Sequence, residues 1–289
     1  MKIHKKWDPL LFLALPLAVY LMVVLIPIFF SVYYSLMEWN GISKMKFVGL
    51  ENFVKLFNDP NLLISLTNSL KFTVTATLCE VGGGMILAIL VQQIRRGRDI
   101  FRVIFFMPVI ISSMAMSQTF RKLLSINPDG VVNALLGAIG LSRFKTAFLA
   151  DMNLTLWIVA IVDAYKFCGL YLVIFYAAFT SIDNEIIEAA TIDGAKGRQL
   201  YTRIRLPMIR GIIVSCISLA VTGTLKAFDM PFILTNGGPG YASELIALYM
   251  YKTAFNSMDY GYGSVLGLLV VFLCIVSFSL IGRLTRQYD

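Results

Sequence analysis

Charged side chains and histidine are scarce in this chain. Of its 289 residues, 15% are charged and 58% are hydrophobic, and the one histidine is His4. With a mean hydropathy of +0.76, the chain has too little polar surface for a soluble globular protein, so we expect an integral membrane protein. A lone histidine with no His/Cys cluster leaves no metal site to propose. An intramembrane enzyme is disfavoured too, because no Ser/His pair, paired aspartate motif or metal cluster is present.

Cysteine is scarce as well, and its positions argue against a disulfide framework. A credible external disulfide needs two cysteines in loops. The four cysteines instead fall inside apolar runs: Cys79, Cys168, Cys216 and Cys274. The first apolar run is too long for a signal peptide, carries Pro16 and Pro27, and lacks a small-x-small cleavage site. We therefore expect it to be a retained helix.

Long apolar runs are what the chain does have. Five of them approach or exceed the ~20 residues that a membrane-spanning helix needs. A sixth is less apolar but has no charged residue from Val103 to Phe120. We predict an all-α, polytopic membrane protein, a single transmembrane domain over residues 1–289 with six helices. The expected spans are about 10–34, 70–92, 101–120, 154–179, 209–228 and 261–281.

The net charge of +8 does not indicate a nucleic-acid partner, because the basic residues follow the membrane topology. With the N-terminus in the cytosol, six spans place 14 Lys and Arg residues in cytosolic segments and 8 in external ones, although the external segments are longer. This is the positive-inside bias. We expect both termini and residues 182–207 in the cytosol, a lipid bilayer around the spans, and no nucleic acid.

The external segments contain two short helical patterns and a sharp turn. Phe53, Leu56 and Phe57 have the spacing of an amphipathic helix over Glu51–Phe57. Residues 127–130 read Asn-Pro-Asp-Gly and predict a turn, after which 131–141 has helical spacing. Residues 236–240 read Asn-Gly-Gly-Pro-Gly, a turn that no helix could cross.

Five ionisable residues lie within or at the edge of the apolar spans: Glu80, Asp163, Lys166, Lys226 and Asp229. At membrane depth such groups normally face a bundle interior or a water-filled cavity. Asp163 and Lys166 are three residues apart, as are Lys226 and Asp229, so each couple can pair on one helix face. Two interpretations stay open. In the first, the two residues of each pair merely neutralise each other's charge. In the second, these residues line a substrate pathway together with Tyr165.

A charged island lies between the fourth and fifth spans. Asp183 is placed to cap a helix that runs through Ala190, and Gly194 can take the positive φ that ends it. A second helix would follow from Ala195, with Arg205 in solvent, and Pro207 would stop it before the next span. We expect a helix–turn–helix hairpin exposed in the cytosol; the alternative is a simple interfacial linker.

The island resembles the EAA loop in membrane subunits of binding-protein-dependent ABC importers. The matching residues are Glu188, Ala189, Ala190, Asp193, Gly194, Ala195, Tyr201, Ile204, Leu206 and Pro207. The resemblance implies a type I importer permease whose hairpin is the coupling helix that grips an ATPase subunit. Tyr201 stands where the family usually has Phe. Asp183 follows Ile182 where the family often has Pro, and Asp can cap the helix instead.

Further segments look like the carbohydrate-uptake branch of that family. They read Phe-Val-Gly-Leu-Glu-Asn-Phe at 47–53, Arg-Val-Ile-Phe-Phe-Met-Pro at 102–108, Asp-Gly-Val-Val-Asn at 129–133, Leu-Thr-Asn-Gly-Gly-Pro at 234–239 and Tyr-Met-Tyr-Lys-Thr-Ala-Phe at 249–255. The 234–239 segment is similar to the maltose/glycerol-phosphate type of first permease subunit. The implied partners are a second, homologous permease, two copies of an ATP-binding subunit and an extracytoplasmic sugar-binding protein. The implied location is a bacterial or archaeal plasma membrane.

The chain has no Gly-rich loop ending in Gly-Lys-Ser/Thr, so it cannot bind ATP in the P-loop manner. We therefore expect no cofactor on this chain, with ATP and Mg²⁺ on the partner ATPase. The alternative function is an ion-coupled secondary transporter or channel, in which Glu80, Asp163 and Lys166 would couple to ions and the hairpin would need no cytosolic partner.

The charge asymmetry and span count predict which residues can be labelled from outside the cell. In a background without the four native cysteines, Ser43→Cys, Ser142→Cys and Ser243→Cys should react with an impermeant thiol reagent in intact cells. Thr202→Cys should stay protected until the cells are opened. Labelling of Thr202→Cys from outside would overturn the orientation.

Overall fold

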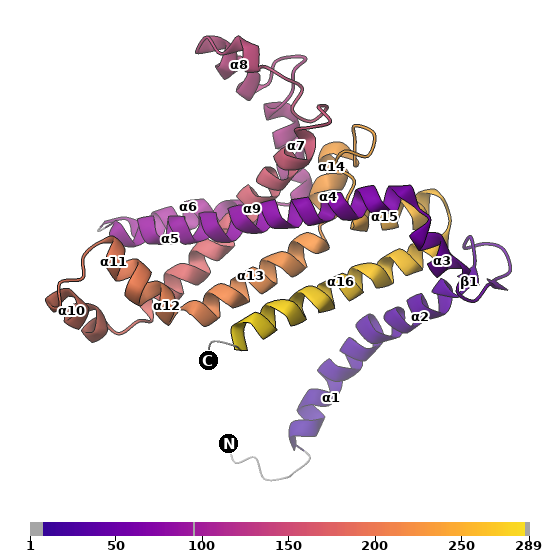
Figure 1. Ribbon diagram of the computed structural model, residues 1–289, viewed down its shortest axis with the longest axis horizontal. Helices are drawn as coiled ribbons and strands as arrows, with labels where there is room; N and C mark the ends of the chain where they lie inside the picture. Colours follow the sequence, from indigo (N-terminus) through magenta and orange to yellow (C-terminus); the bar gives the residue numbers. More distant parts are fainter. Residues whose placement is uncertain (1–7, 95, 287–289) are drawn as a thin grey trace. The chain divides into compact units, whose positions relative to one another are not determined.

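Helices make up most of the described chain (Figure 1). The computed structural model describes residues 8–94 and 96–286. The all-α prediction is confirmed, and the sheet found in this part of the chain is a single two-stranded ribbon. His4, the tail lysines Lys2, Lys5 and Lys6, and Arg95 lie outside the described residues.

The described chain groups into two compact units. The first combines the residues up to Pro60 with Tyr249–Phe272, and the second combines Asn61–Leu248 with the residues from Leu273 onward. The single domain over 1–289 stays a prediction.

The first unit begins with a long apolar helical run. α1 (Asp8–Tyr20), the π-turn η1 (Leu21–Leu25) and α2 (Ile26–Ser35) follow one another without a break. Residues Phe12–Ser35 are long and apolar enough to span a membrane, and none of their most apolar window is buried within the chain. This agrees with the expected first span, whose surface is left to lipid or another subunit.

Beyond this helix, short elements are fastened to one another by buried polar contacts. β1 (Met37–Glu38) pairs antiparallel with β2 (Lys46–Phe47), and α3 (Glu51–Phe57) has the bounds predicted for the amphipathic helix. Later in the chain come α15 (Ile246–Tyr251), the π-turn η5 (Lys252–Asn256) and α16 (Tyr260–Arg286). The Asp59 carboxylate accepts hydrogen bonds of 2.6 Å from the hydroxyls of Tyr249 and Tyr262, so distant segments of the sequence meet at one acceptor.

The second unit opens with a helical run that begins earlier than the sequence predicted. α4 (Pro60–Thr77), the π-turn η2 (Leu78–Gly82) and α5 (Gly83–Gln93) form one run of 34 residues. We expected this span to begin near Leu70, because polar residues precede it. The structure pairs those polar groups: the Asn68 side-chain amide donates to the backbone oxygens of Tyr241 and Glu244, and the Ser69 hydroxyl accepts from the Ile246 N–H.

The expected third span is not one straight helix. α6 (Arg98–Ile110) and α7 (Ser113–Leu123) are bent by 97° at a short break. Pro108 removes a backbone donor near the end of α6, and Ile111 is extended, with φ −67° and ψ 135°. Four continuous helices are long and apolar enough to cross a membrane, and the described residues hold up to six if each of two bent pairs counts as one span.

α9 (Thr155–Thr180) is the central helix of the second unit. It packs with α5 and α13 (Arg210–Leu225) in one apolar cluster, and with α4, α7 and α14 (Asp229–Thr235) in another. Glycines allow the close approach: a Cβ on Gly84 would lie 2.5 Å from the Tyr171 Cβ, and one on Gly169 would collide with the Phe105 carbonyl oxygen of α6. Gly84 and Gly169 are therefore positions of close helix–helix packing.

The remaining elements are short. α8 (Val131–Ala138) confirms the helix expected after the turn at 127–130, and η3 (Ser142–Phe144) follows it. α10 (Asn184–Ile192), α11 (Arg198–Leu200), the π-turn η4 (Tyr201–Arg205) and α12 (Leu206–Met208) form the segment between α9 and α13. The expected turn after α14 is present, with φ of 49° at Asn236 and 80° at Gly237.

The contact between α6 and α9 predicts a sharp stability effect at Gly169. Gly169→Ala should push α6 away from α9 and lower stability by roughly 1–3 kcal/mol, the usual cost of overpacking. It should be visible as a lower unfolding temperature of the purified protein in detergent. Gly211→Ala is the control, since a Cβ there meets no atom within 4 Å. An equal effect of both substitutions would contradict the close approach.

Candidate functional site

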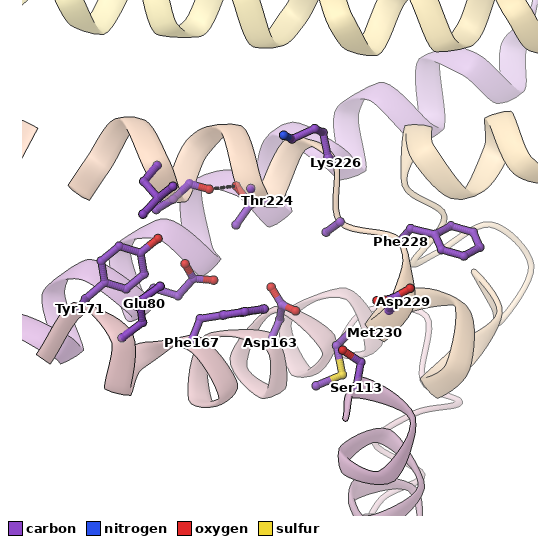
Figure 2. A pocket seen from close by; sticks show the side chains of 15 residues that line it. Glu80, Ser113, Asp163, Phe167, Tyr171, Thr224, Lys226, Phe228, Asp229 and Met230 are labelled. Atoms are coloured by element: carbon purple, nitrogen blue, oxygen red, sulfur yellow. Dashed lines mark hydrogen bonds between the residues drawn. The ribbon is translucent and has the colours of Figure 1, made fainter. Parts of the chain in front are cut away.

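A polar cavity lies inside the second unit, between α9 and α13 (Figure 2). Its volume is about 340 Å³. It is lined by Glu80, Ser113, Asp163, Phe167, Leu170, Tyr171, Leu219, Ala220, Gly223, Thr224, Lys226, Ala227, Phe228, Asp229 and Met230. Four of the six residues predicted to line a substrate pathway are among them: Glu80, Asp163, Lys226 and Asp229.

Two buried carboxylates face this cavity from neighbouring elements. Glu80, on the π-turn η2, is 2% exposed, and Asp163, on α9, is 5% exposed. Figure 2 shows both carboxylates directed into the space between α9 and α13, with the Tyr171 hydroxyl beside Glu80. Within the described residues, no donor hydrogen-bonds to the Glu80 Oε1 atom. A buried acceptor without a donor is costly, and single-turn π-helices within longer helices occur often at functional sites.

The other end of the cavity is formed where α13 ends and α14 begins. Lys226 is the residue that follows α13, and Asp229 is the first residue of α14. The break between the two helices separates their side chains, and the ion pair considered from the sequence does not form: the salt bridges in the described residues join other residues. Lys226 and Asp229 line the cavity separately.

The predicted couple of Asp163 and Lys166 does not form a salt bridge either. Lys166 Nζ donates to the backbone oxygen of Ile111 at 2.9 Å and to the Ser113 hydroxyl at 2.7 Å. These two acceptors lie at the break between α6 and α7. Lys166 is therefore a brace for the bent helix pair, and it is absent from the cavity lining.

Tyr165 also lies outside the cavity. Its ring packs edge-on against Phe120 with centroids 5.6 Å apart, and it lines a separate hollow of about 350 Å³ with Phe105 and Pro108. The cavity is also lined by Ser113, Tyr171 and Thr224, which were not predicted from the sequence. The break after Pro108 was the one signal in the sequence that could have drawn attention to Ser113.

The charged island forms the predicted hairpin, with several corrected boundaries. Asp183 occupies the N-cap position of α10 but makes no capping hydrogen bond, and α10 runs through Ala190 to Ile192, just before the expected turn. Gly194 has φ +91°, as predicted. The second arm begins at Arg198 instead of Ala195, because Gly197 has φ +49° and ψ −113°, outside the helical region.

Pro207 does not stop the second arm. It lies inside the continuous helical run Arg198–Met208, directly after the π-turn η4. The break comes at Ile209, with φ −98° and ψ 15°, and the helices on either side are bent by 73°. The expected stop is therefore present two residues later, and its cause is the change of direction into α13.

The two arms of the hairpin differ in how they are held. The first arm, α10, has no buried residue, and Ile192 is 86% exposed. Of the predicted coupling residues, Glu188, Ala189, Asp193 and Gly194 are exposed and Ala190 and Ala195 are half-buried. The first arm is thus an uncovered helix on the surface of the second unit (Figure 1).

The second arm is anchored to the helical body. Tyr201 and Leu206 pack against the cluster of α5, α9 and α13, and the Tyr201 and Phe179 rings meet edge-on with centroids 5.9 Å apart. Arg205 was expected in solvent. Its Nη1 instead donates to Gln92 Oε1 of α5 at 2.8 Å and to the Tyr201 hydroxyl at 3.1 Å. The hairpin therefore joins an uncovered arm to the end of α5 and to α13.

Comparisons with known proteins agree with this architecture. The family described as "Binding-protein-dependent transport system inner membrane component" matches residues 80–289. The "Probable ABC transporter permease protein YurN" of Bacillus subtilis is 36% identical over 276 residues, 94% of each chain. The "Multiple sugar-binding transport system permease protein MsmF" of Streptococcus mutans is 27% identical over 100% of this chain and 98% of its own. A solved bacterial ABC transporter that imports the acidic polysaccharide alginate has a similar fold, with TM-score 0.85 and 23% identity over 98% of this chain and 97% of its own.

The positions of Asp163 and Lys166 predict different effects of replacing them. Asp163→Asn should impair transport while the protein still assembles, because the carboxylate faces the cavity. Lys166→Met should lower stability, because it leaves the acceptors at the α6–α7 break without their donor. Combining the two should not restore uptake, measured with the assembled transporter. Rescue by the double variant would show that the two charges merely neutralise each other.

Proposed function

The chain belongs to the family of inner membrane components of binding-protein-dependent transport systems, and we propose that it forms half of the translocation pathway of an ATP-driven sugar importer. Membership of this family favours an ATP-driven importer over the ion-coupled secondary transporter or channel considered from the sequence. The chain is then a transport subunit without an ATPase site of its own. A second, homologous permease would supply the other half of the pathway.

The observation that carries the proposal is the uncovered first arm of an otherwise anchored hairpin. A helix without a buried residue, presenting Ala189 and Ala190, is a surface that can enter a cleft on another protein. Glu188, Asp193 and Gly194 lie on or next to this arm and are exposed. The partner would be one of two ATPase subunits, which would hold ATP and Mg²⁺.

The helices connect this arm to the cavity. The second arm contacts α5 through Arg205 and Gln92 and continues into α13 after the bend at Ile209. The π-turn η2 leads directly into α5 and places Glu80 in the cavity lining. Gly223 and Thr224 of α13 also line the cavity. A movement of the hairpin would therefore displace two walls of the cavity, as alternating exposure of a binding site requires.

A sugar is the substrate that the cavity and the relatives favour together. The name of MsmF assigns multiple sugar-binding transport to that relative. In this chain Phe167, Tyr171 and Phe228 offer aromatic rings beside carboxylates and hydroxyls. A sugar has both apolar ring faces and hydroxyl donors, so it suits such a lining. An extracytoplasmic binding protein would deliver it to the side opposite the hairpin, with both termini and the hairpin in the cytosol.

The coupling role predicts that two changes in the hairpin uncouple transport without unfolding the protein. Gly194→Val places a β-branched residue at φ +91°, which costs roughly 1–2 kcal/mol or more. Ala190→Asp adds bulk and charge at the docking surface. Both variants should insert normally, lose ATP-driven uptake and retain less ATPase on purification.

Gly140→Val is the matched control. Gly140 also has positive φ, at +77°, and a Cβ there meets no atom within 4 Å, so the backbone strain is similar but lies outside the hairpin. It should keep normal uptake and ATPase retention. Normal values of both measurements for Gly194→Val and Ala190→Asp would show that the hairpin is not the coupling site.

A further inference from the structure

We propose that the seam between α6 and α9 binds one anionic phospholipid. Its headgroup would lie at Arg98 and Arg102, and one acyl chain would lie in the apolar hollow that Tyr165 lines. This inference goes beyond the proposed function, because it does not depend on which solute the transporter carries. It follows from two guanidinium groups held at one ring, from an uncharged hollow along the same two helices, and from the distance between the two.

Two arginines converge on Tyr176 of α9. The Arg98 Nη1 atom lies 3.4 Å from the Tyr176 hydroxyl oxygen, to which it donates. The guanidinium carbon of Arg102 lies 4.4 Å from the centre of the same ring. Arg98 and Arg102 are four residues apart on α6, and like charges at this spacing repel each other. A neutral phenol does not offset that repulsion, so an anion at this place would stabilise the pair.

The charges around this pair leave it short of negative partners. Arg102 forms a salt bridge of 3.0 Å with Asp99, whose side chain is 81% exposed and therefore largely hydrated. The Arg102 Nε atom has no acceptor within the described residues. Arg96, also exposed, precedes this turn of the helix. Three cations thus meet one carboxylate between residues 96 and 102, and a phosphate group is the anion that guanidinium groups bind best.

The hollow lies further along the same two helices. Its volume is about 350 Å³, and none of its lining residues carries a charge. Phe105 and Pro108 of α6 and Cys168 of α9 are among them. It is open to the surroundings, because Ile104 and Ile161 at its wall are both 51% exposed. Unfilled space of this kind forfeits van der Waals contacts, which a hydrocarbon chain from the bilayer would supply.

The spacing of the two parts matches one leaflet of a membrane. Tyr176, at the arginines, and Ile161, at the wall of the hollow, are both on α9, and at ~1.5 Å per residue they lie about 22 Å apart along the helix. Half of a bilayer, headgroups included, is about 20 Å thick. The expected orientation places the arginines in the cytosolic leaflet, where anionic lipids are bound by basic side chains between helices.

Lipid titration of the complete transporter tests the headgroup site. The transporter is purified, delipidated in detergent, and titrated with dioleoyl phosphatidylglycerol or dioleoyl phosphatidylcholine, and bound lipid is counted by native mass spectrometry. Wild type should bind the anionic lipid roughly ten-fold more tightly than the zwitterionic one. Arg98→Gln and Arg102→Gln should each weaken binding of the anionic lipid roughly five-fold and leave phosphatidylcholine unchanged.

Arg121→Gln is the matched control for lost charge, because Arg121 is an exposed arginine on α7, outside this seam. It should leave both affinities unchanged. Equal binding of the two lipids by wild type would overturn the proposal, as expected if another subunit covers the seam. Displacement of the bound lipid by an equal concentration of inorganic phosphate would also overturn it, since the arginines would then serve a soluble anion.

A bulky side chain in the hollow tests the acyl-chain site. Ile161→Trp should narrow the hollow and weaken phosphatidylglycerol binding several-fold, while the half-exposed position leaves the helix packing intact. Ile86→Trp is the control: Ile86 is 58% exposed on α5 and is not part of the lining. An equal affinity of the two tryptophan variants for phosphatidylglycerol would show that the chain does not enter the hollow, and the proposal would fail.

Discussion

The close approach of helix backbones around α9 is the constraint on which the second unit depends. Gly84 lets α5 lie against Tyr171, and Gly169 lets α6 lie against the same helix at Phe105. In a membrane, where apolar surface gains little from leaving lipid, such small-residue contacts are a main source of helix association. They bring Glu80 of η2 beside Asp163 of α9, so the polar cavity exists because the helices on that side can approach so closely.

Polar side chains at membrane depth are of two kinds in this chain. Lys166 donates two hydrogen bonds at the break between α6 and α7, and Asn68 donates to backbone oxygens of the segment before α15. Glu80 keeps a buried oxygen without a donor. The first kind stabilises irregular backbone where hydrogen bonds to water are not available. The second kind leaves binding capacity for a ligand, which is why the cavity and not the bend is the candidate binding site.

Much of the fold could be predicted from local pattern. The spans over α1–α2, α9 and α16, the amphipathic helix α3 and the positive φ of Gly194 follow from apolar run length, helical spacing and the conformational freedom of glycine. The boundaries that were wrong depend on partners distant in the sequence. α4 begins at Pro60 because Asn68 and Ser69 find partners between Tyr241 and Ile246, and Arg205 leaves solvent because Gln92 lies within reach.

The sequence by itself determined the membrane class of the chain, the number of apolar runs and the hairpin with its glycine turn, because these follow from composition and short-range order. Only the tertiary structure decided which ionisable residues share a cavity. Asp163 and Lys166 stay within electrostatic reach of each other on α9. The bend between α6 and α7, however, supplies the hydrogen-bond acceptors of Lys166, and the packing of η2 places a second carboxylate, Glu80, near Asp163. Side-chain partners across helices are set by backbone approach and helix bending, and neither is encoded in the local pattern of residues.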